Sequence, residues 1–414
     1  MTNNGPSTWV DRFDTIAVFS GALVPIGIAV GNAGYEAMIS MTGLCWIIRS
    51  ILAKSNPIPA LVKHPLLQGW LALYGCILVS LLWNGPGSKG WAHDVVLIRH
   101  LLFFAAFIDI SRRRNVIRPL IIGLGAGVLW AALNALLAYS IGHDLIGKSI
   151  ARYDNKLKEG ERIASFAAYA GPFFLAWGLL AKDLLLKRRA VFFGIGGIAC
   201  IMLVVFHIRT AQVGAIFGIL MAGTLYLYRA LPRKLVMVLF LLLGLFMGVG
   251  VKYTNFDNLD GIDDRINLDS MYDRVNIWKV SWVMWKDNPV FGVSVSGWKD
   301  AYKKTVASFP PYVWPDGRVI RDAEAMHCHN LFLQILSSLG IVGILCFCWF
   351  FVNIIRSTLS SGMSGWRSGL PIWPAIFLVI GLTGWNFFGS QYLPIFTYFL
   401  SLTAIPYGGK QSVV

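Results

Sequence analysis

The amino-acid sequence predicts an all-α integral membrane protein of about twelve transmembrane helices with one large, partly helical outer loop. Of its 414 residues, 56% are hydrophobic and 14% are charged, whereas a soluble domain averages about 25% charged residues. The mean hydropathy is +0.62. Apolar stretches long enough to cross a bilayer, roughly 17–25 residues each, recur along most of the chain.

Each of these apolar stretches is expected to form one transmembrane helix. Several contain proline, including Pro25, Pro172 and Pro374. A membrane bundle accommodates such residues because neighbouring helices satisfy the backbone groups that they free. The twelve stretches are 14–31, 35–53, 65–83, 95–110, 116–140, 163–181, 190–207, 211–228, 235–251, 329–353, 370–388 and 391–407.

Lysine and arginine are concentrated in the loops that follow the even-numbered stretches, for example at Arg112, Arg113 and Arg114. Because cytoplasmic loops are enriched in basic residues, this bias predicts that these loops and both termini face the cytoplasm. The first stretch is expected to be a retained helix and not a cleaved signal. The outer side then holds two long loops, at 141–162 and 252–328.

The charge and the cysteine usage exclude two classes of protein. The formal net charge is +15, but much of it belongs to the cytoplasmic loops, and no basic stripe has the spacing of a nucleic-acid reader. No nucleic-acid partner is therefore expected. Five of the six cysteines fall inside apolar stretches, and only Cys328 lies in an outer loop, so the chain has no disulfide framework.

Three regions follow from this topology. Residues 1–251 are expected to hold the first nine helices, with the short outer loop 141–162. Residues 252–328 form the large outer loop, and residues 329–414 hold the last three helices. A loop of 77 residues with a helical pattern of its own is expected to be a small embedded domain.

A helix with a wide aromatic stripe is predicted inside this large loop. Met271, Val275, Trp278, Trp282 and Trp285 recur at spacings of 4, 3, 4 and 3 residues, which is the period of an amphipathic helix. Tryptophan-rich helices of this kind rest at the level of the lipid headgroups. An ordinary helix that packs on the bundle has the same pattern. Both interpretations place the loop at the membrane surface.

Several outer arginines are candidates for binding phosphate, because the planar guanidinium group matches phosphate oxygens. Arg209 lies between the seventh and eighth stretches, Arg274 lies at the edge of the aromatic stripe, and Arg265 and Arg152 lie in the two long loops. Together they suggest a diphosphate held near the outer leaflet. The alternative for each is snorkelling at the interface or a salt bridge with a nearby aspartate.

His329 begins the tenth stretch, where the large loop meets the membrane. A neutral imidazole has a pKa near ambient pH, so it can act as a general base. A metal site is the second interpretation, because His327 and Cys328 are adjacent. A spacing of two residues does not bring His327 and His329 to one face of a helix, and neither a metal nor a cofactor is expected. A capping or packing role is the third possibility.

The motif around His329 resembles that of a known family. His329 and Asn330 are followed by nine residues and then by Gly340-Ile341-Val342-Gly343. This arrangement is similar to the H[NSQ]-x9-G-x-x-[GTY] pattern of O-antigen ligases. The segment from Arg274 to Trp278, followed by Pro289-Val-Phe-Gly292, resembles the Arg…Trp…Pro-x-x-Gly region of the periplasmic loop in that family, and Arg209 resembles a family arginine.

The resemblance implies a fold like that of the polytopic glycosyltransferases that use lipid-linked donors, in the bacterial inner membrane, with the active site on the periplasmic side. The donor would be O-antigen on undecaprenyl pyrophosphate, and the acceptor would be a sugar hydroxyl of lipid A–core. Transfer would be inverting and independent of metal. His329 would deprotonate the acceptor, while Arg209, Arg274, Arg265 and Arg152 would bind the pyrophosphate, with Asn330, Gly340, Gly343 and Trp278 as motif residues.

Three other functions remain open from the sequence. An O-antigen or exopolysaccharide polymerase and a protein O-oligosaccharyltransferase belong to the same superfamily. A transporter or flippase also has about twelve spans, but its ionisable residues are expected on broken helices at mid-membrane. In this chain the unassigned ionisable residues are concentrated in the outer loops, which favours an enzyme at the membrane surface.

Overall fold

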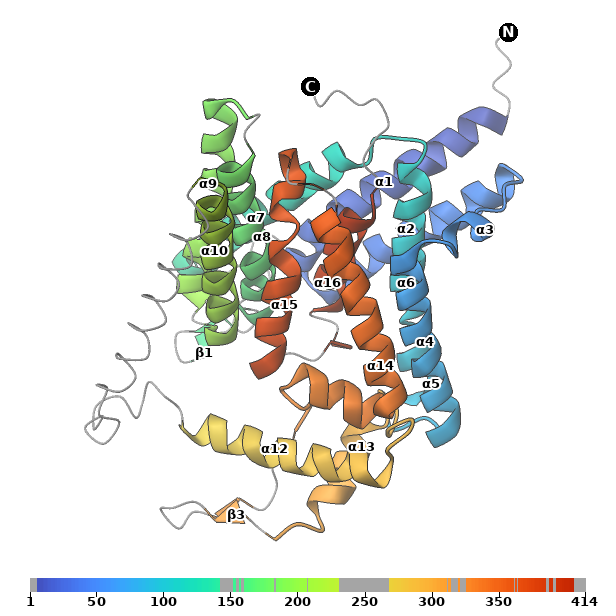
Figure 1. Cartoon of the computed structure of the whole chain (residues 1–414), viewed down its shortest axis with the longest axis vertical. Coiled ribbons are helices and arrows are strands. Elements are labelled where there is room, and N and C mark those ends of the chain that lie inside the picture. Colours follow the sequence, from blue (N-terminus) through green and yellow to red (C-terminus); the bar gives the residue numbers. More distant parts are fainter. Residues whose placement is uncertain are drawn as a thin grey trace, which may run out of the picture.

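The computed structural model describes residues 6–141, 152–153, 156–157, 160–181, 184–206, 208–230, 268–310, 312–313, 319–320, 325–360, 362, 364–384, 387–389 and 392–405. These residues form a bundle of α-helices (Figure 1). Two antiparallel hairpins accompany it. One pairs β1 (Arg152–Tyr153) with β2 (Lys156–Leu157), and the other pairs β3 (Tyr312–Val313) with β4 (Val319–Ile320).

Helices account for most of the described chain. They are α1 (Pro6–Val30), α2 (Asn32–Leu52), α3 (Ile58–Leu61), α4 (Pro65–Asn84), α5 (Gly90–Val95), α6 (Ile98–Ser111), α7 (Ile117–Ile141), α8 (Gly160–Leu180), α9 (Leu186–Phe206), α10 (Arg209–Ala230), α12 (Leu268–Asp287), α13 (Trp298–Val306), α14 (Leu331–Ser360), the 3-10 helix η2 (Gly365–Gly369), α15 (Ile372–Thr383) and α16 (Leu393–Ala404).

Eight helical segments of the described chain are long and apolar enough to cross a membrane, which agrees with the prediction of an integral membrane protein. They coincide with eight of the twelve expected stretches. Of the other four, 35–53 is α2, which contains Glu36 and Arg49, while 95–110 and 391–407 correspond to the shorter helices α6 and α16. The stretch 235–251 lies outside the described residues.

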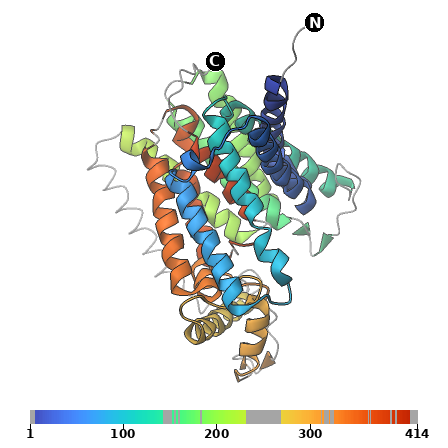
Figure 2. The same ribbon diagram turned by 90° about the vertical axis from the view of Figure 1, so that its right-hand side faces the viewer.

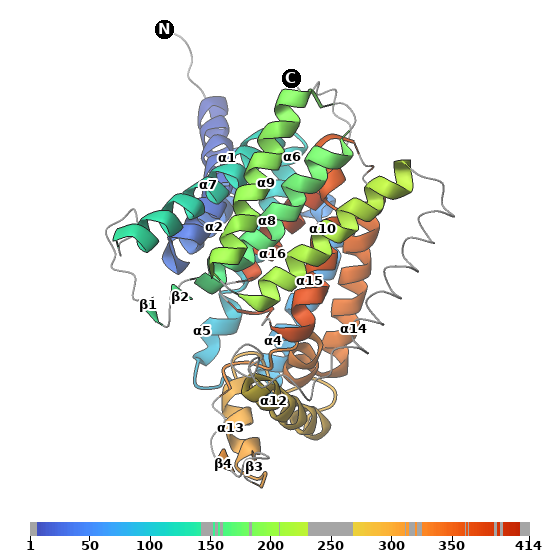
Figure 3. The same cartoon turned by 90° about the vertical axis from the view of Figure 1, so that its left-hand side faces the viewer.

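The centre of the bundle is formed by α8 and α16. All residues of α16 are buried, and so are most of those of α8. Phe173 of α8 packs edge-on against Phe399 of α16, with ring centroids 5.7 Å apart. Around this pair, α1 packs against α2 and α7, α9 and α10 pack against α8, and α4 packs against α14 (Figure 3). Helix α8 and the shorter α16, of 12 residues, are thus shielded by the helices around them.

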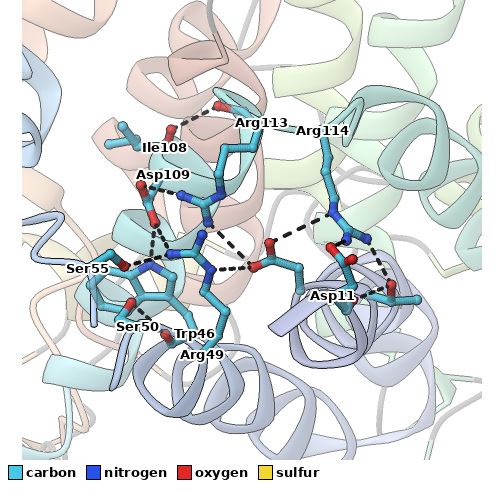
Figure 4. A network of polar contacts seen from close by, with 12 residues as sticks. Asp11, Trp46, Arg49, Ser50, Ser55, Ile108, Asp109, Arg113 and Arg114 are labelled. Atoms are coloured by element: carbon cyan, nitrogen blue, oxygen red, sulfur yellow. Dashed lines mark hydrogen bonds and ion pairs between the residues drawn. The ribbon is translucent and has the colours of Figure 1, made fainter. Parts of the chain in front are cut away.

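A buried cluster of charges joins α1, α2 and α6 at one end of the bundle (Figure 4). The Arg49 guanidinium lies 3.4 Å from the Asp14 carboxylate, and Arg113 lies 2.8 Å from Asp109. Trp46 Nε1 donates to Asp109 Oδ2 at 3.0 Å. Arg114 continues the cluster toward α1. Paired charges of both signs are tolerated here because each offsets the desolvation of the other.

Helices α12 and α13 lie together at the opposite end (Figures 1 and 2). They enclose a small core of their own that includes Ile277, Val280, Met284, Trp298 and Tyr302. An embedded unit with its own core was the expectation for this loop.

The face of α12 that enters this core differs from the predicted aromatic stripe. Ile277, Val280 and Met284 are buried, whereas Val275 is 39% exposed and Trp282 is 43% exposed. Helix α12 packs against both α13 and the start of α14, and these two partners cover the strip that holds Ile277, Val280 and Met284. The aromatic stripe lies beside that strip and stays partly exposed.

Candidate functional site

Helix α14 is sharply bent at Gly340, where the backbone adopts φ 66° and ψ −164° (Figure 1). A positive φ favours glycine because other residues suffer steric strain there. The bend separates a short outer segment, 331–339, from the long apolar part of the helix. Gly340 of the motif therefore creates a joint just after the helix segment that begins beside His329.

The loop between α12 and α13 fills the joint. Pro289 O accepts the Ile341 N–H at 2.9 Å, and Val290 O accepts the Val342 N–H at 3.3 Å. These are backbone donors that the bend deprives of helical partners. The fit is close on both sides. A Cβ on Gly340 would lie 2.1 Å from Val290 O, and a Cβ on Gly292 would lie 2.3 Å from the Ser338 carbonyl carbon. The two glycine motifs thus form one interlocked joint.

Asn330 begins α14 as a helix cap. Its Oδ1 accepts the Leu333 N–H at 3.0 Å, which satisfies a free donor of the first turn. Its Nδ2 donates to Leu382 O at 3.1 Å, near the end of α15. One side chain therefore both starts α14 and attaches that start to α15.

The segment before α14 is held from the other side by Trp278. Trp278 Nε1 donates to Cys328 O at 3.0 Å, and the Cys328 N–H donates to Gln334 Oε1 at 2.7 Å. The Cys328 side chain is fully buried in the α12–α13 core. It is therefore packed against α12, and burial raises its pKa to about 12.

His329 lies between these two anchors with φ 53°. This conformation is uncommon for a non-glycine residue and marks a locally constrained backbone. Its ring packs on that of His327, with centroids 4.0 Å apart. Burial lowers the pKa of His329 and the positive charge of Arg274 lowers it further, while a hydrogen bond to the Gly384 backbone opposes both. The imidazole is thus neutral at neutral pH.

His327 is the more buried of the two rings. Burial and the adjacent His329 lower its pKa to about 4. It too interacts with the Gly384 backbone. Two neutral imidazoles therefore face the carboxyl end of α15.

Arg274 belongs to the same site. It lies one turn before Trp278 on α12, and it is half-buried. Burial lowers its pKa, and its charge acts on both histidines. No carboxylate among the described side chains forms an ion pair with it. A partly desolvated guanidinium of this kind is well suited to bind an anion.

Arg209 approaches from another direction. It is the first residue of α10, and its side chain is exposed. The next residue, Thr210, contacts Gly384, where an added Cβ would lie 2.8 Å from Thr210 Cγ2. The amino-terminal end of α10 therefore reaches the same glycine that both histidines approach. Free N–H groups and the helix dipole at such an end favour anions.

Two predicted arginines are not placed at the site. Arg265 lies outside the described residues, and Arg152 is in β1 with a side chain that is not described. Gly343 follows the joint, where an added Cβ would lie 2.1 Å from Leu339 Cβ. Arg99 Nη2 lies 2.9 Å from Glu36 Oε1, and His100 Nδ1 lies 3.2 Å from Thr397 Oγ1.

Three site residues were missed by sequence reasoning. Gly384 is approached by three residues, His327, His329 and Thr210. Lys89, in the α4–α5 loop, is close enough for its charge to lower the pKa of His327. Ser80 contacts the interlocked joint. Lys89 is a cation in a short loop between two apolar stretches, which is a signal that the sequence carries. Ser80 and Gly384 are ordinary residues of apolar stretches and have no sequence signal.

Comparison with known families agrees with the motif. Residues 194–348 match the family model described as O-Antigen ligase. The matched segment contains Arg209, Arg274, the α12–α13 loop, His329 and both glycines of the joint. It confirms the resemblance to O-antigen ligases over this segment. No curated protein matches the chain.

Proposed function

Because residues 194–348 carry the O-antigen ligase family segment, we propose that the protein is an O-antigen ligase. It transfers O-antigen polysaccharide from undecaprenyl pyrophosphate to a sugar hydroxyl of lipid A–core in lipopolysaccharide biosynthesis. The observation that carries the proposal is the convergence on Gly384, where a neutral His329 lies within the electrostatic reach of Arg274 and beside the start of α10.

His329 acts as the general base. Its lowered pKa keeps the imidazole unprotonated at neutral pH, so it can accept the proton of the acceptor hydroxyl. The freed oxygen attacks the anomeric carbon of the donor sugar and forms the new glycosidic bond. The bond between that carbon and the pyrophosphate oxygen breaks in the same displacement, which inverts the anomeric configuration.

Arg274 and Arg209 offset the charge on the departing pyrophosphate. Their guanidinium groups come from α12 and α10, and the amino-terminal end of α10 adds its N–H groups. Preorganised cations of this kind stabilise charge as it develops on the leaving group. Arg265 and Arg152 are proposed to extend this cationic surface. With these groups in place the reaction is proposed to need no divalent metal.

The membrane arrangement belongs to the same proposal. All twelve stretches cross the bacterial inner membrane, both termini lie in the cytoplasm, and residues 252–328 form a periplasmic loop between residues 1–251 and 329–414. The alternating chain direction supports this arrangement, because the α4–α5 loop, the start of α10, α12, α13 and the start of α14 gather at one end of the bundle (Figure 1).

Two measurements test the function. The purified protein in liposomes should join lipid-linked glycan to lipid A–core. His329→Ala should reduce this transfer to a small residual rate, while His64→Ala, at the far end of α4, should not. A His329→Ala protein that inserts, folds and keeps its rate contradicts the role of His329.

Gene deletion separates the ligase from a polymerase. Loss of a ligase leaves bare core, with polymer accumulating on its lipid carrier. A lipopolysaccharide gel that instead shows core with one repeat unit would identify a polymerase.

A further inference from the structure

Ser80 lies at the outer end of α4 and is fully buried. Its hydroxyl forms hydrogen bonds with backbone groups outside α4. Ser80 Oγ donates to Phe291 O at 2.6 Å and lies 3.1 Å from Ser338 O, so its single proton is directed at two carbonyls. The same oxygen accepts the Ser294 N–H at 3.1 Å. One hydroxyl therefore connects three segments of the chain.

These three segments are α4, the loop 288–297 and the outer part of α14. The loop contacts α14 through further bonds, because Ser337 O accepts the Val293 N–H at 3.0 Å and Ser337 Oγ accepts the Trp298 indole N–H at 2.8 Å. The loop and the outer part of α14 therefore form one unit. Ser80 fixes that unit to α4, which is long enough to span the membrane.

Both proposed functional side chains depend on this unit. His329 directly precedes its α14 segment, and Arg274 lies on α12, which leads into its loop. Movement of the unit against α4 would displace both residues relative to α10 and α15. The distance between a base and its substrate affects rate strongly, since a shift of about 1 Å can reduce it by about 10²-fold.

We propose that Ser80 is a positioning residue of the transfer reaction, because its hydroxyl joins α4, the Phe291–Ser294 turn and Ser338 and thereby holds His329 in place. The inference rests on the proposed role of His329. Ser80 itself does not touch substrate. Its effect is on the alignment of the base with the sugar that it activates.

The test is steady-state kinetics of the full-length protein in liposomes, with lipid-linked glycan as donor and lipid A–core as acceptor. Ser80→Ala should lower kcat about 10-fold or more, while KM for the donor changes less than about 2-fold. Ser80→Thr keeps the hydroxyl and should restore most of kcat. Ser401→Ala is the matched control, because its buried hydroxyl donates within α16, to Thr397 O at 2.8 Å.

A second comparison separates positioning from general support of the fold. In a His329→Ala background there is no base to align, so Ser80→Ala should leave the residual rate unchanged. A loss of the same factor in both backgrounds overturns the proposal, as does an unchanged kcat in Ser80→Ala. If Ser80→Ala does not fold, Ser80→Cys preserves the shape with a weak donor, and full kcat in that variant is equally contradictory.

If the proposed role of His329 as the base is wrong, the kinetic results differ. If His329→Ala alone keeps its rate, His329 is not the base, whatever Ser80 does. If His329→Ala is inactive and Ser80→Ala is normal, only the positioning role is wrong.

Discussion

Cys76 of α4 and Cys346 of α14 lie face to face, with their Sγ atoms 3.4 Å apart. They are separated by 270 positions in the sequence, so their contact reports the packing of α4 against α14 directly. Neither is part of the proposed site. The pair offers a test of the arrangement on which the position of the interlocked joint depends.

The first prediction concerns this pair. A thiol-specific oxidant that enters membranes should link Cys76 to Cys346 in the native protein, since both thiols are within reach of a disulfide after small side-chain rotations. Proteolysis between the two helices followed by a non-reducing gel will detect the link. Cys76→Ser should prevent it, and Cys348→Ser, on an exposed face of α14, should not. Persistence of the link in Cys76→Ser would show that other cysteines are in contact.

The second prediction concerns pH. The charge of Arg274 lowers the pKa of His329, so Arg274→Ala should raise that pKa. Activity requires the neutral base and is lost as pH falls through this pKa, so the acidic limb of kcat/KM should move to higher pH in Arg274→Ala. Arg274→Lys retains the charge and should keep the limb near its original position, although both variants lose activity because pyrophosphate binding is weakened. If the acidic limb lies at the same pH in the native protein and in both variants, the charge of Arg274 does not lower the pKa of His329.

The third prediction concerns the interlocked joint. Gly340→Ala combines a positive φ with a Cβ placed 2.1 Å from Val290 O, so the loop must move out of the joint. We expect a loss of transfer of about 10²-fold. Gly362 has φ +76° with nothing within 4 Å of an added Cβ, so Gly362→Ala carries the backbone strain without the collision. Full activity of Gly340→Ala would show that the joint is not required for transfer. An equal loss in Gly362→Ala would show that backbone strain is enough to cause it.

The fourth prediction concerns the buried charge cluster. Arg49→Met should leave Asp14 and Asp109 with fewer partners and reduce the free energy of unfolding by about 3–5 kcal/mol. Thermal unfolding followed by size-exclusion fluorescence will measure this loss. Arg356→Met, on an exposed surface of α14, is the control and should unfold near the native temperature. Similar melting temperatures for the two variants would mean that the cluster adds little stability.

The fifth prediction concerns metal. With Arg274 and Arg209 offsetting the pyrophosphate charge, EDTA should not inhibit the purified enzyme. Transfer assays with and without chelator will check this, and restoration of a chelated sample by a divalent cation would establish a metal requirement.

Much of the candidate site could be proposed from the sequence, because the chemical properties of its residues follow from their amino-acid type. His329, Arg274 and Arg209 were selected as an imidazole and two guanidinium groups in outer segments, and the structure brings them to one end of the bundle around Gly384. The membrane class was likewise evident from hydropathy. The buried face of α12 was not predicted, because periodicity identifies an apolar face without showing which of its residues a partner will cover.

The remaining contacts depend on distant pairs that sequence patterns do not reveal. Ser80 and Phe291 are 211 positions apart, and nothing in an apolar helix marks one serine as a contact of a loop. Gly384 acts through its backbone, which has no sequence signature beyond the glycine itself. The contact of Gly292 with Ser338 also appears only when two motifs that are separate in the chain are placed side by side.

The bend at Gly340 also explains why the spacing within the motif matters. Residues 331 and 339 are eight helical steps, or about 2.2 turns, apart, so they point about 80° apart around the helix axis. One end is docked on the loop, and the other carries His329 toward α15. Adding or removing a single residue would rotate the histidine by about 100° around the helix axis. The number of residues between His329 and Gly340 therefore sets the orientation of His329 relative to the joint.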